Sequence, residues 1–346
     1  MKRKNMKNYI LLNENAVYYE CGFSCDNVVF LKLGSIKYFI TDARYTVEAK
    51  EYAKDCIVIE SSDFIKDVQK ILKKSKIKKI VFDPNDFKLS FYQKLTNDIK
   101  IKFEAKENFS KLKRIIKSDE EIELLKKAAQ IGRDGFKDLA KFIRKNGFRE
   151  SENFLHFKAI EKMSHIGKYD LSFDPIVAIN KNAAKPHALP TNTKLKLHDL
   201  LLVDAGVKYK RYCSDRTCTS HVDFENFSFK REQNFKSKKH QKIYDLVYKA
   251  QLNAIEKARI GMKASQIDKL TRDVIEKAGF GKYFVHSTGH GVGLDIHEFP
   301  NINSRSDVII EDNMVFTIEP GIYLPEEFGV RIEDTVVMKN GKAQIL

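Results

Sequence analysis

Residues 201–221 read LLVDAGVKYKRYCSDRTCTSH, and this segment decides how the C-terminal half of the chain is interpreted. An apolar strand carries one carboxylate, Asp204, and after a short polar turn the chain returns through Asp215. A charge inside such a strand is costly unless it is paired or binds a cation. Because neighbouring strands can direct both aspartates into one site, and hard divalent ions prefer carboxylate oxygen, the segment is compatible with a cation site. Taken alone, it is explained equally well by two aspartates that merely end their strands.

Two further acids follow at the ends or in the middle of apolar runs. Glu319 follows a strand-like run in the sequence IEPG, and Glu333 lies inside another in VRIED. Four carboxylates in one pocket would raise one another's pKa and resist ionisation, whereas two divalent ions balance four negative charges almost completely. The number of acids therefore predicts a dinuclear metal centre.

A fifth ligand candidate comes from residues 286–298, which read HSTGHGVGLDIHE. Glycines in this stretch would let the backbone pass close to a metal or a substrate. An imidazole among carboxylates suits Mn, Fe, Co or Zn better than Mg or Ca. Three histidines within twelve positions favour a functional site over a structural role.

These motifs together resemble one known family, the creatinase/aminopeptidase (pita-bread) metallopeptidases. The resemblance rests on the order, spacing and flanking residues of five positions: Asp204 and Asp215 in D-x10-D, His290 in TGHGVG, Glu319 in IEPG and Glu333 in RIEDT. In the first third of the chain, TDARY at 41–45 and KRIIKS at 113–118 resemble signatures of the N-terminal domain of the Xaa-Pro branch. Methionine aminopeptidases generally lack that domain and are a poorer match.

The resemblance implies a ligand set and a cofactor. Asp204 would chelate one metal, His290 and Glu319 would bind the other, and Asp215 and Glu333 would bridge the two. The cofactor would be two divalent ions per subunit, with Mn2+ expected and Co2+, Zn2+ or Fe2+ as alternatives. Glu319 would also shuttle a proton from the nucleophile toward the leaving proline nitrogen.

The resemblance also implies roles outside the ligand set. His187 and His297 would contact the substrate, with His297 at its carbonyl. His286 and Arg331 would line the proline side of the cleft. Thr217 and Thr317 are expected to hydrogen-bond the ligating acids.

The domain boundary is predicted just before a long helix. Ser118 and Glu121 form a capping-box motif, and apolar residues then recur at helical spacing as far as Ile143. We therefore expect an α/β N-terminal domain over residues 1–112 and an α+β pita-bread catalytic domain over residues 113–346. The polar, basic segment 224–240 is expected to be a solvated surface insertion.

The amino-acid composition limits the classes of partner that we expect for the protein. At 346 residues, with 42% hydrophobic and 32% charged residues, the chain has the composition of a globular protein with room for two cores. The net charge of +15 comes from scattered lysines without an aromatic-basic recognition motif, so nucleic acid is not the expected partner. No apolar run reaches the length of a membrane helix. Five cysteines without a C-x-x-C pair favour reduced thiols in a cytoplasm, and the resemblance implies a homodimer.

Two activities of the Xaa-Pro branch stay open. The chain is predicted to release the residue before proline from short peptides, either as an Xaa-Pro aminopeptidase, which accepts longer peptides, or as an Xaa-Pro dipeptidase (prolidase). We favour the aminopeptidase slightly. A non-catalytic binding module and a metal-free creatinase-type hydrolase are the remaining alternatives, and the intact set of four acids and one histidine disfavours both.

Overall fold

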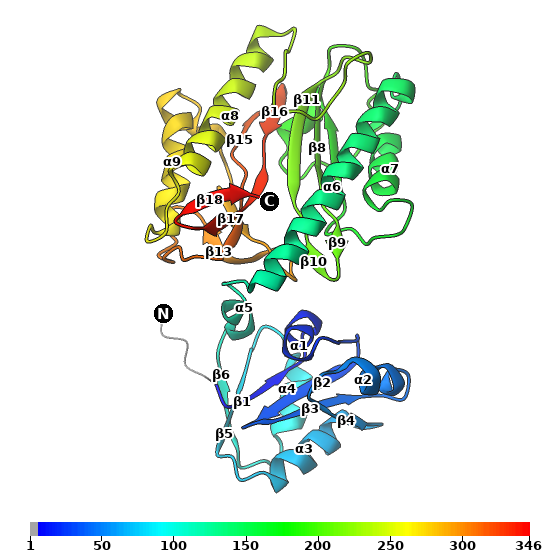
Figure 1. Cartoon of the computed structure of the whole chain (residues 1–346), viewed down its shortest axis with the longest axis vertical. Coiled ribbons are helices and arrows are strands. Elements are labelled where there is room, and N and C mark those ends of the chain that lie inside the picture. The colour runs from blue at the N-terminus through cyan, green and yellow to red at the C-terminus, as the bar shows by residue number, and fades with distance from the viewer. Residues whose placement is uncertain (1–5) are drawn as a thin grey trace. The chain divides into compact units, whose positions relative to one another are not determined.

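A computed structural model describes residues 6–346, and within them the chain divides into two units between Arg114 and Ile115 (Figure 1). No helix within residues 6–346 is both long and apolar enough to cross a membrane. Each unit has its own sheets and its own buried apolar side chains.

The first unit is built on a six-stranded sheet with the order β4-β3-β2-β1-β5-β6. Its strands are β1 (Asn8–Leu11), β2 (Val28–Leu33), β3 (Ile36–Thr41), β4 (Ile57–Glu60), β5 (Lys79–Phe82) and β6 (Lys102–Ala105). Its helices are α1 (Glu14–Cys21), α2 (Thr46–Tyr52), α3 (Phe64–Lys74), α4 (Leu89–Thr96) and α5 (Phe109–Lys113). Alternate residues of β1 enter two cores: Tyr9 packs with α1 and α2, and Ile10 packs with α3 and α4.

The second unit carries helix pairs outside two groups of strands (Figure 1). The helices are α6 (Asp119–Asn146), α7 (Glu152–Met163), α8 (Lys238–Lys257) and α9 (Ala264–Lys277). Ser118 caps α6 in a full capping box with Glu121. A three-stranded sheet, in the order β11-β8-β7, consists of β7 (Ile176–Ile179), β8 (Leu200–Ala205) and β11 (Arg216–His221). The short hairpin β9 (Lys208–Tyr209) and β10 (Tyr212–Cys213) joins β8 to β11.

A five-stranded sheet with the order β13-β12-β14-β17-β18 completes the unit, together with the hairpin β15–β16. These strands are β12 (Gly289–Gly291), β13 (Glu298–Ile302), β14 (Val315–Ile318), β15 (Gly321–Leu324), β16 (Phe328–Arg331), β17 (Asp334–Lys339) and β18 (Lys342–Ile345). The run from Val330 to Met338 reads as one strand in sequence, but β16 stops at Arg331 and β17 begins at Asp334. Glu333 therefore lies in a break between two strands.

Side-chain alternation along β8 orients Asp204. Leu201 and Val203 face the core that includes α6 and α7. Leu200 and Leu202 belong to the core that includes α8, β15 and β16. Asp204 shares the parity of Leu200 and Leu202, so its carboxylate is directed toward the half of the unit that carries Glu319 and Glu333.

The segment 224–240 is only partly a solvated insertion: many of its polar side chains are exposed, but it is anchored to the fold. Phe227, Phe229 and Phe235 are buried within it. The Tyr244 hydroxyl donates a hydrogen bond to the Arg231 carbonyl at 2.8 Å. Three phenylalanines of the segment, which lie among its polar and basic residues in sequence, anchor it to the fold.

Candidate metal centre

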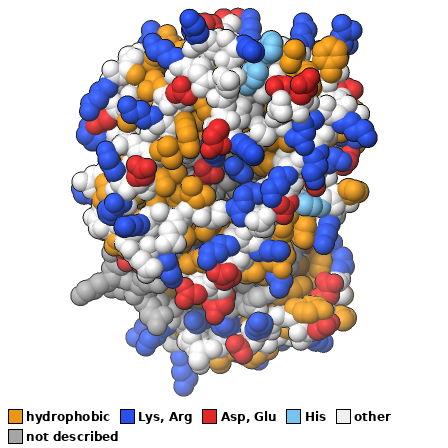
Figure 2. Space-filling view, turned by 45° about the horizontal axis from the view of Figure 1, so that its top comes forward, with side chains coloured by type: hydrophobic (Ala, Val, Ile, Leu, Met, Phe, Trp, Pro, Cys, Tyr) orange, Lys and Arg blue, Asp and Glu red, His pale blue; other side chains and the backbone are white. Residues whose placement is uncertain are grey.

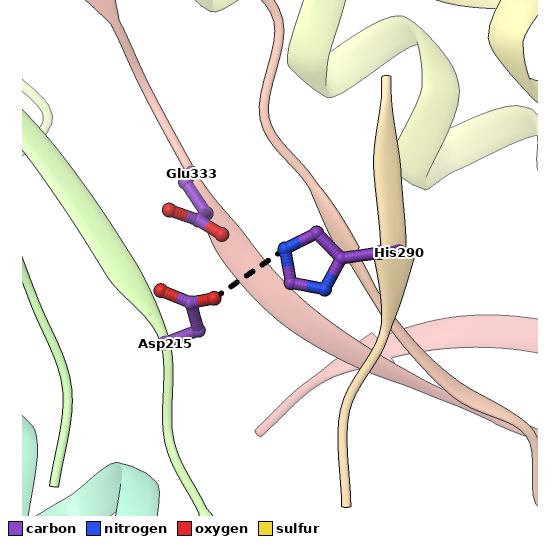
Figure 3. A group of neighbouring side chains, drawn as sticks. All are labelled: Asp215, His290 and Glu333. Carbon is purple, nitrogen blue, oxygen red and sulfur yellow. Dashed lines mark ion pairs between the residues drawn. The ribbon is translucent and has the colours of Figure 1, made fainter. Parts of the chain in front are cut away.

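Three side chains from distant segments converge on one point. Asp215 lies just before β11, His290 lies on β12, and Glu333 lies between β16 and β17. Each offers a ligand atom, and these atoms lie within 4.8 Å of one another. Figure 3 shows the two carboxylates and the imidazole pointing toward a common space. The distance from His290 Nε2 to Asp215 Oδ2 is 3.6 Å, and the distance to Glu319 Oε1 is 3.3 Å.

Asp204 reaches the same region from β8, where its register partner on β11 is Thr217. Its Oδ2 accepts a hydrogen bond from Arg331 at 2.7 Å. Its Oδ1 and the Oε1 of Glu333 are buried, and within residues 6–346 neither has a hydrogen-bond partner. Buried carboxylate oxygens without donors are strongly unfavourable unless a cation lies beside them. The residues present therefore fit a divalent metal.

The electrostatics of the cluster support the same conclusion. Burial and repulsion from Glu333 and Asp204 raise the pKa of Asp215 well above its usual range. Burial and repulsion from Glu319 and Asp204 do the same to the pKa of Glu333. Burial also raises the pKa of Glu319 to about 7, although Arg331 opposes this. The carboxyl groups therefore cannot all be ionised at once at neutral pH unless cations are bound beside them.

The imidazole is held in the form that can bind a metal. Burial lowers the pKa of His290, which keeps the ring neutral. Its Nδ1 lies 3.1 Å from the Gly291 carbonyl and donates to it, so the lone pair is on Nε2. Nε2 is the atom that faces Asp215 and Glu319.

Two threonines orient the acids through hydrogen bonds. Thr217 Oγ1 donates to Glu333 Oε2 at 2.7 Å, and Thr317 Oγ1 donates to Glu319 Oε1 at 3.0 Å. The Thr317 hydroxyl also accepts the His290 main-chain N–H at 3.1 Å. Both threonine side chains are buried, so these bonds are shielded from water.

The glycines around His290 serve strand packing. A Cβ on Gly289 would lie 2.0 Å from the Thr317 carbonyl oxygen, and a Cβ on Gly291 would lie 2.2 Å from that of Phe299. The sequence indicated that glycine clears space for a metal or a substrate. At these two positions it clears space for neighbouring backbone instead, which lets β12 lie close to the adjoining strands.

A chain of hydrogen bonds runs along one side of the centre. Arg331 donates to the Tyr323 hydroxyl at 2.8 Å and to the Pro186 carbonyl at 3.1 Å. Burial, together with the charge of Arg331, lowers the pKa of His286 to about 4. The neutral ring donates from Nδ1 to the Ser287 carbonyl at 2.7 Å, which leaves Nε2 to accept from Tyr323 at 2.9 Å. Sequence reasoning missed Tyr323, because in GIYL it reads as an apolar strand residue.

His187 and His297 lie at the rim with exposed side chains. The His297 ring packs edge-on against His290, with the ring centroids 4.4 Å apart. His187 follows Pro186, whose carbonyl accepts a hydrogen bond from Arg331. Both imidazoles are thus near the cluster but outside the ligand geometry, where an incoming molecule can contact them.

Known proteins share this architecture along nearly the whole chain. The model of metallopeptidase family M24 matches residues 123–340, and that of the creatinase/prolidase N-terminal domain matches residues 1–119. The uncharacterized peptidase YqhT of Bacillus subtilis is 36% identical over 343 residues, which cover 97% of this chain and 92% of that protein.

Two solved structures show the same similarity in three dimensions. The Xaa-Pro dipeptidase from Bacillus anthracis superposes with a TM-score of 0.89 at 34% identity, covering 98% of this chain and 92% of that one. The X-Pro aminopeptidase from Thermotoga maritima superposes with a TM-score of 0.87 at 30% identity, covering 98% and 95%. The chain therefore belongs to metallopeptidase family M24 and combines a creatinase/prolidase N-terminal domain with a catalytic domain of the pita-bread fold.

Proposed function

We propose that this metallopeptidase hydrolyses the Xaa-Pro bond at the N-terminus of short peptides, acting as an Xaa-Pro aminopeptidase. Two divalent ions, with Mn2+ as the favoured metal, would be held by Asp204, Asp215, His290, Glu319 and Glu333. The observation that carries the proposal is the convergence of Asp215, His290 and Glu333, with Glu319 3.3 Å from the His290 imidazole. Buried oxygens of Asp204 and Glu333 have no hydrogen-bond partner within residues 6–346, which supports it further.

The ions would supply Lewis acidity, lowering the pKa of a shared water and polarising the scissile carbonyl. Proton transfer and substrate binding would be carried out by side chains of the protein. Glu319, whose Oε1 lies 3.3 Å from His290 Nε2 within the cluster, would hold and pass a proton between the nucleophile and the leaving nitrogen. Thr317 fixes its Oε1, which leaves Oε2 for that transfer. His297 and His187 would donate hydrogen bonds to the substrate at the exposed rim.

The wall formed by Arg331, Tyr323 and His286 is proposed to face the proline residue. Proline's tertiary amide has no N–H, so a site for it must use shape and the carbonyl instead of an amide donor. The connected hydrogen bonds hold three side chains in fixed positions, which provides such a shape. Arg331 is also tied to Asp204, so the wall and the metal ligands form one network.

The aminopeptidase and the dipeptidase are distinguished by substrate length. The relatives include an Xaa-Pro dipeptidase and an X-Pro aminopeptidase at similar identity, so both activities are compatible with the chain. Protein loaded with Mn2+ would be assayed on Ala-Pro and on a longer Xaa-Pro-Xaa peptide. Cleavage of both supports the aminopeptidase, whereas cleavage of the dipeptide alone shows a prolidase. No metal-dependent cleavage of either peptide would contradict the proposed function.

A nucleic-acid-binding role is not supported by the surface. On the face drawn in Figure 2, Lys and Arg side chains are interspersed with acidic and apolar ones and do not form one continuous patch.

We further propose that the enzyme acts in the cytoplasm as a homodimer. All five cysteines are free thiols, which fits a reducing compartment. The proposed dimer is supported by the family resemblance.

A further inference from the structure

Arg231 lies in the segment between β11 and α8, and its side chain contacts main-chain carbonyls beside the metal cluster. Its side chain is only 15% exposed. One terminal nitrogen donates to the Glu333 carbonyl at 2.7 Å and lies 2.5 Å from Asp334 Oδ2. The other donates to the Thr217 carbonyl at 3.4 Å. A single guanidinium therefore joins β11 to the break between β16 and β17.

That break needs support because strand pairing does not supply it. The β15–β16 ladder ends at the pair Gly321 and Arg331, and the β14–β17 ladder resumes at Ile318 and Asp334. Glu333 lies outside both. Its main-chain N–H donates to the Thr217 carbonyl at 3.1 Å, and its carbonyl accepts from Arg231.

The segment that carries Arg231 is itself anchored. The Tyr244 hydroxyl donates to the Arg231 carbonyl at 2.8 Å, and Arg144 donates to the Phe227 carbonyl at 2.6 Å. Phe229 is buried against Phe136, with ring centroids 5.1 Å apart. The main chain that carries Arg231 is therefore fixed, so its guanidinium can hold the Thr217 and Glu333 main chain in place.

We propose that Arg231 is a positioning residue for the metal centre: it fixes the Glu333 main chain and so places the Glu333 carboxylate for metal binding. The segment 224–240 delivers this side chain, which gives the basic loop a role in the active site. The inference rests on the proposed function, because it requires Glu333 to be a metal ligand. Side chains that orient ligands typically change metal affinity by about 10- to 100-fold when removed.

The test uses the full chain, stripped of metal and titrated with Mn2+ by isothermal calorimetry. Arg231→Met is expected to weaken Mn2+ binding at least about tenfold. Lys230→Met, one residue away with an exposed side chain, should bind Mn2+ like the wild type. Leu139→Ala, in the buried core of α6, should lower thermal stability without changing Mn2+ affinity.

Arg231→Lys provides a second variant if the methionine variant does not fold. A lysine keeps the charge but offers a single donor group, so intermediate Mn2+ affinity is expected. Wild-type affinity in the folded Arg231 variants would overturn the inference alone. A wild-type protein that binds no Mn2+ would instead contradict the proposed function, and the inference with it.

Discussion

Removal of the metal should make the stability of the protein fall as the pH rises, and Glu319 allows the effect to be calculated. In the metal-free fold its pKa is about 7, against an ordinary value of 4.5. The folded state therefore holds a proton that the unfolded chain releases. A raised pKa of this kind contributes stability below pH 4.5 that is lost as the pH rises through 7. The raised pKa values of Asp215 and Glu333 act in the same direction.

The expected magnitude follows from the difference between the two pKa values. One pKa unit corresponds to about 1.4 kcal/mol, so the raised pKa of Glu319 alone adds roughly 3 kcal/mol to the free energy of unfolding at low pH. Most of this contribution is lost between pH 5 and pH 8. His286 works in the opposite sense below pH 6.5, because its pKa is lowered to about 4 and its contribution grows as the pH rises. A comparison with a matched variant is therefore needed to cancel the histidine.

The assay is urea denaturation in EDTA at pH 5 and at pH 8, on the wild type and on Glu319→Gln. Glutamine mimics the protonated carboxyl and removes its titration. The wild type should lose roughly 2–3 kcal/mol more than the variant between the two pH values. Glu120→Gln, an exposed control, should behave like the wild type. Parallel pH profiles for the wild type and Glu319→Gln would refute the reasoning, and saturating Mn2+ should raise the stability at pH 8.

Three further outcomes are expected. Asp215→Ala or Glu333→Ala should abolish peptide hydrolysis while the circular dichroism spectrum stays native, and retention of most of the turnover would refute the proposed bridging role. Tyr323→Phe removes the hydroxyl between Arg331 and His286, so kcat/KM on an Xaa-Pro peptide should fall about tenfold with Mn2+ stoichiometry unchanged. Lys117→Met breaks a fully buried ion pair to Glu298 at 2.7 Å, so the free energy of unfolding in urea should fall by about 3–5 kcal/mol. An unchanged denaturation midpoint would count against this.

The acids of the cluster give a clearer signal in the sequence than Tyr323 and Arg231 do. Apolar strands interrupted by Asp204 or Glu319 stand out because a charge there requires an explanation within a few residues. Tyr323 and Arg231 give no such signal. A tyrosine in an apolar strand and an arginine in a basic loop are ordinary locally, and their roles appear only when distant backbone is brought beside them. The same holds for Gly289, whose neighbour Thr317 is remote in sequence.

The contacts of the acids suggest a common design. In Asp204, Glu319 and Glu333, one carboxylate oxygen is hydrogen-bonded by a neighbouring side chain of the protein. In Asp204 and Glu333 the second oxygen is buried and has no hydrogen-bond partner within residues 6–346. A single hydrogen bond fixes the orientation of each carboxylate without using up its capacity as a ligand. The desolvation cost of the second oxygen is offset only when a cation binds, so the cluster is preorganised for metal and destabilising without it.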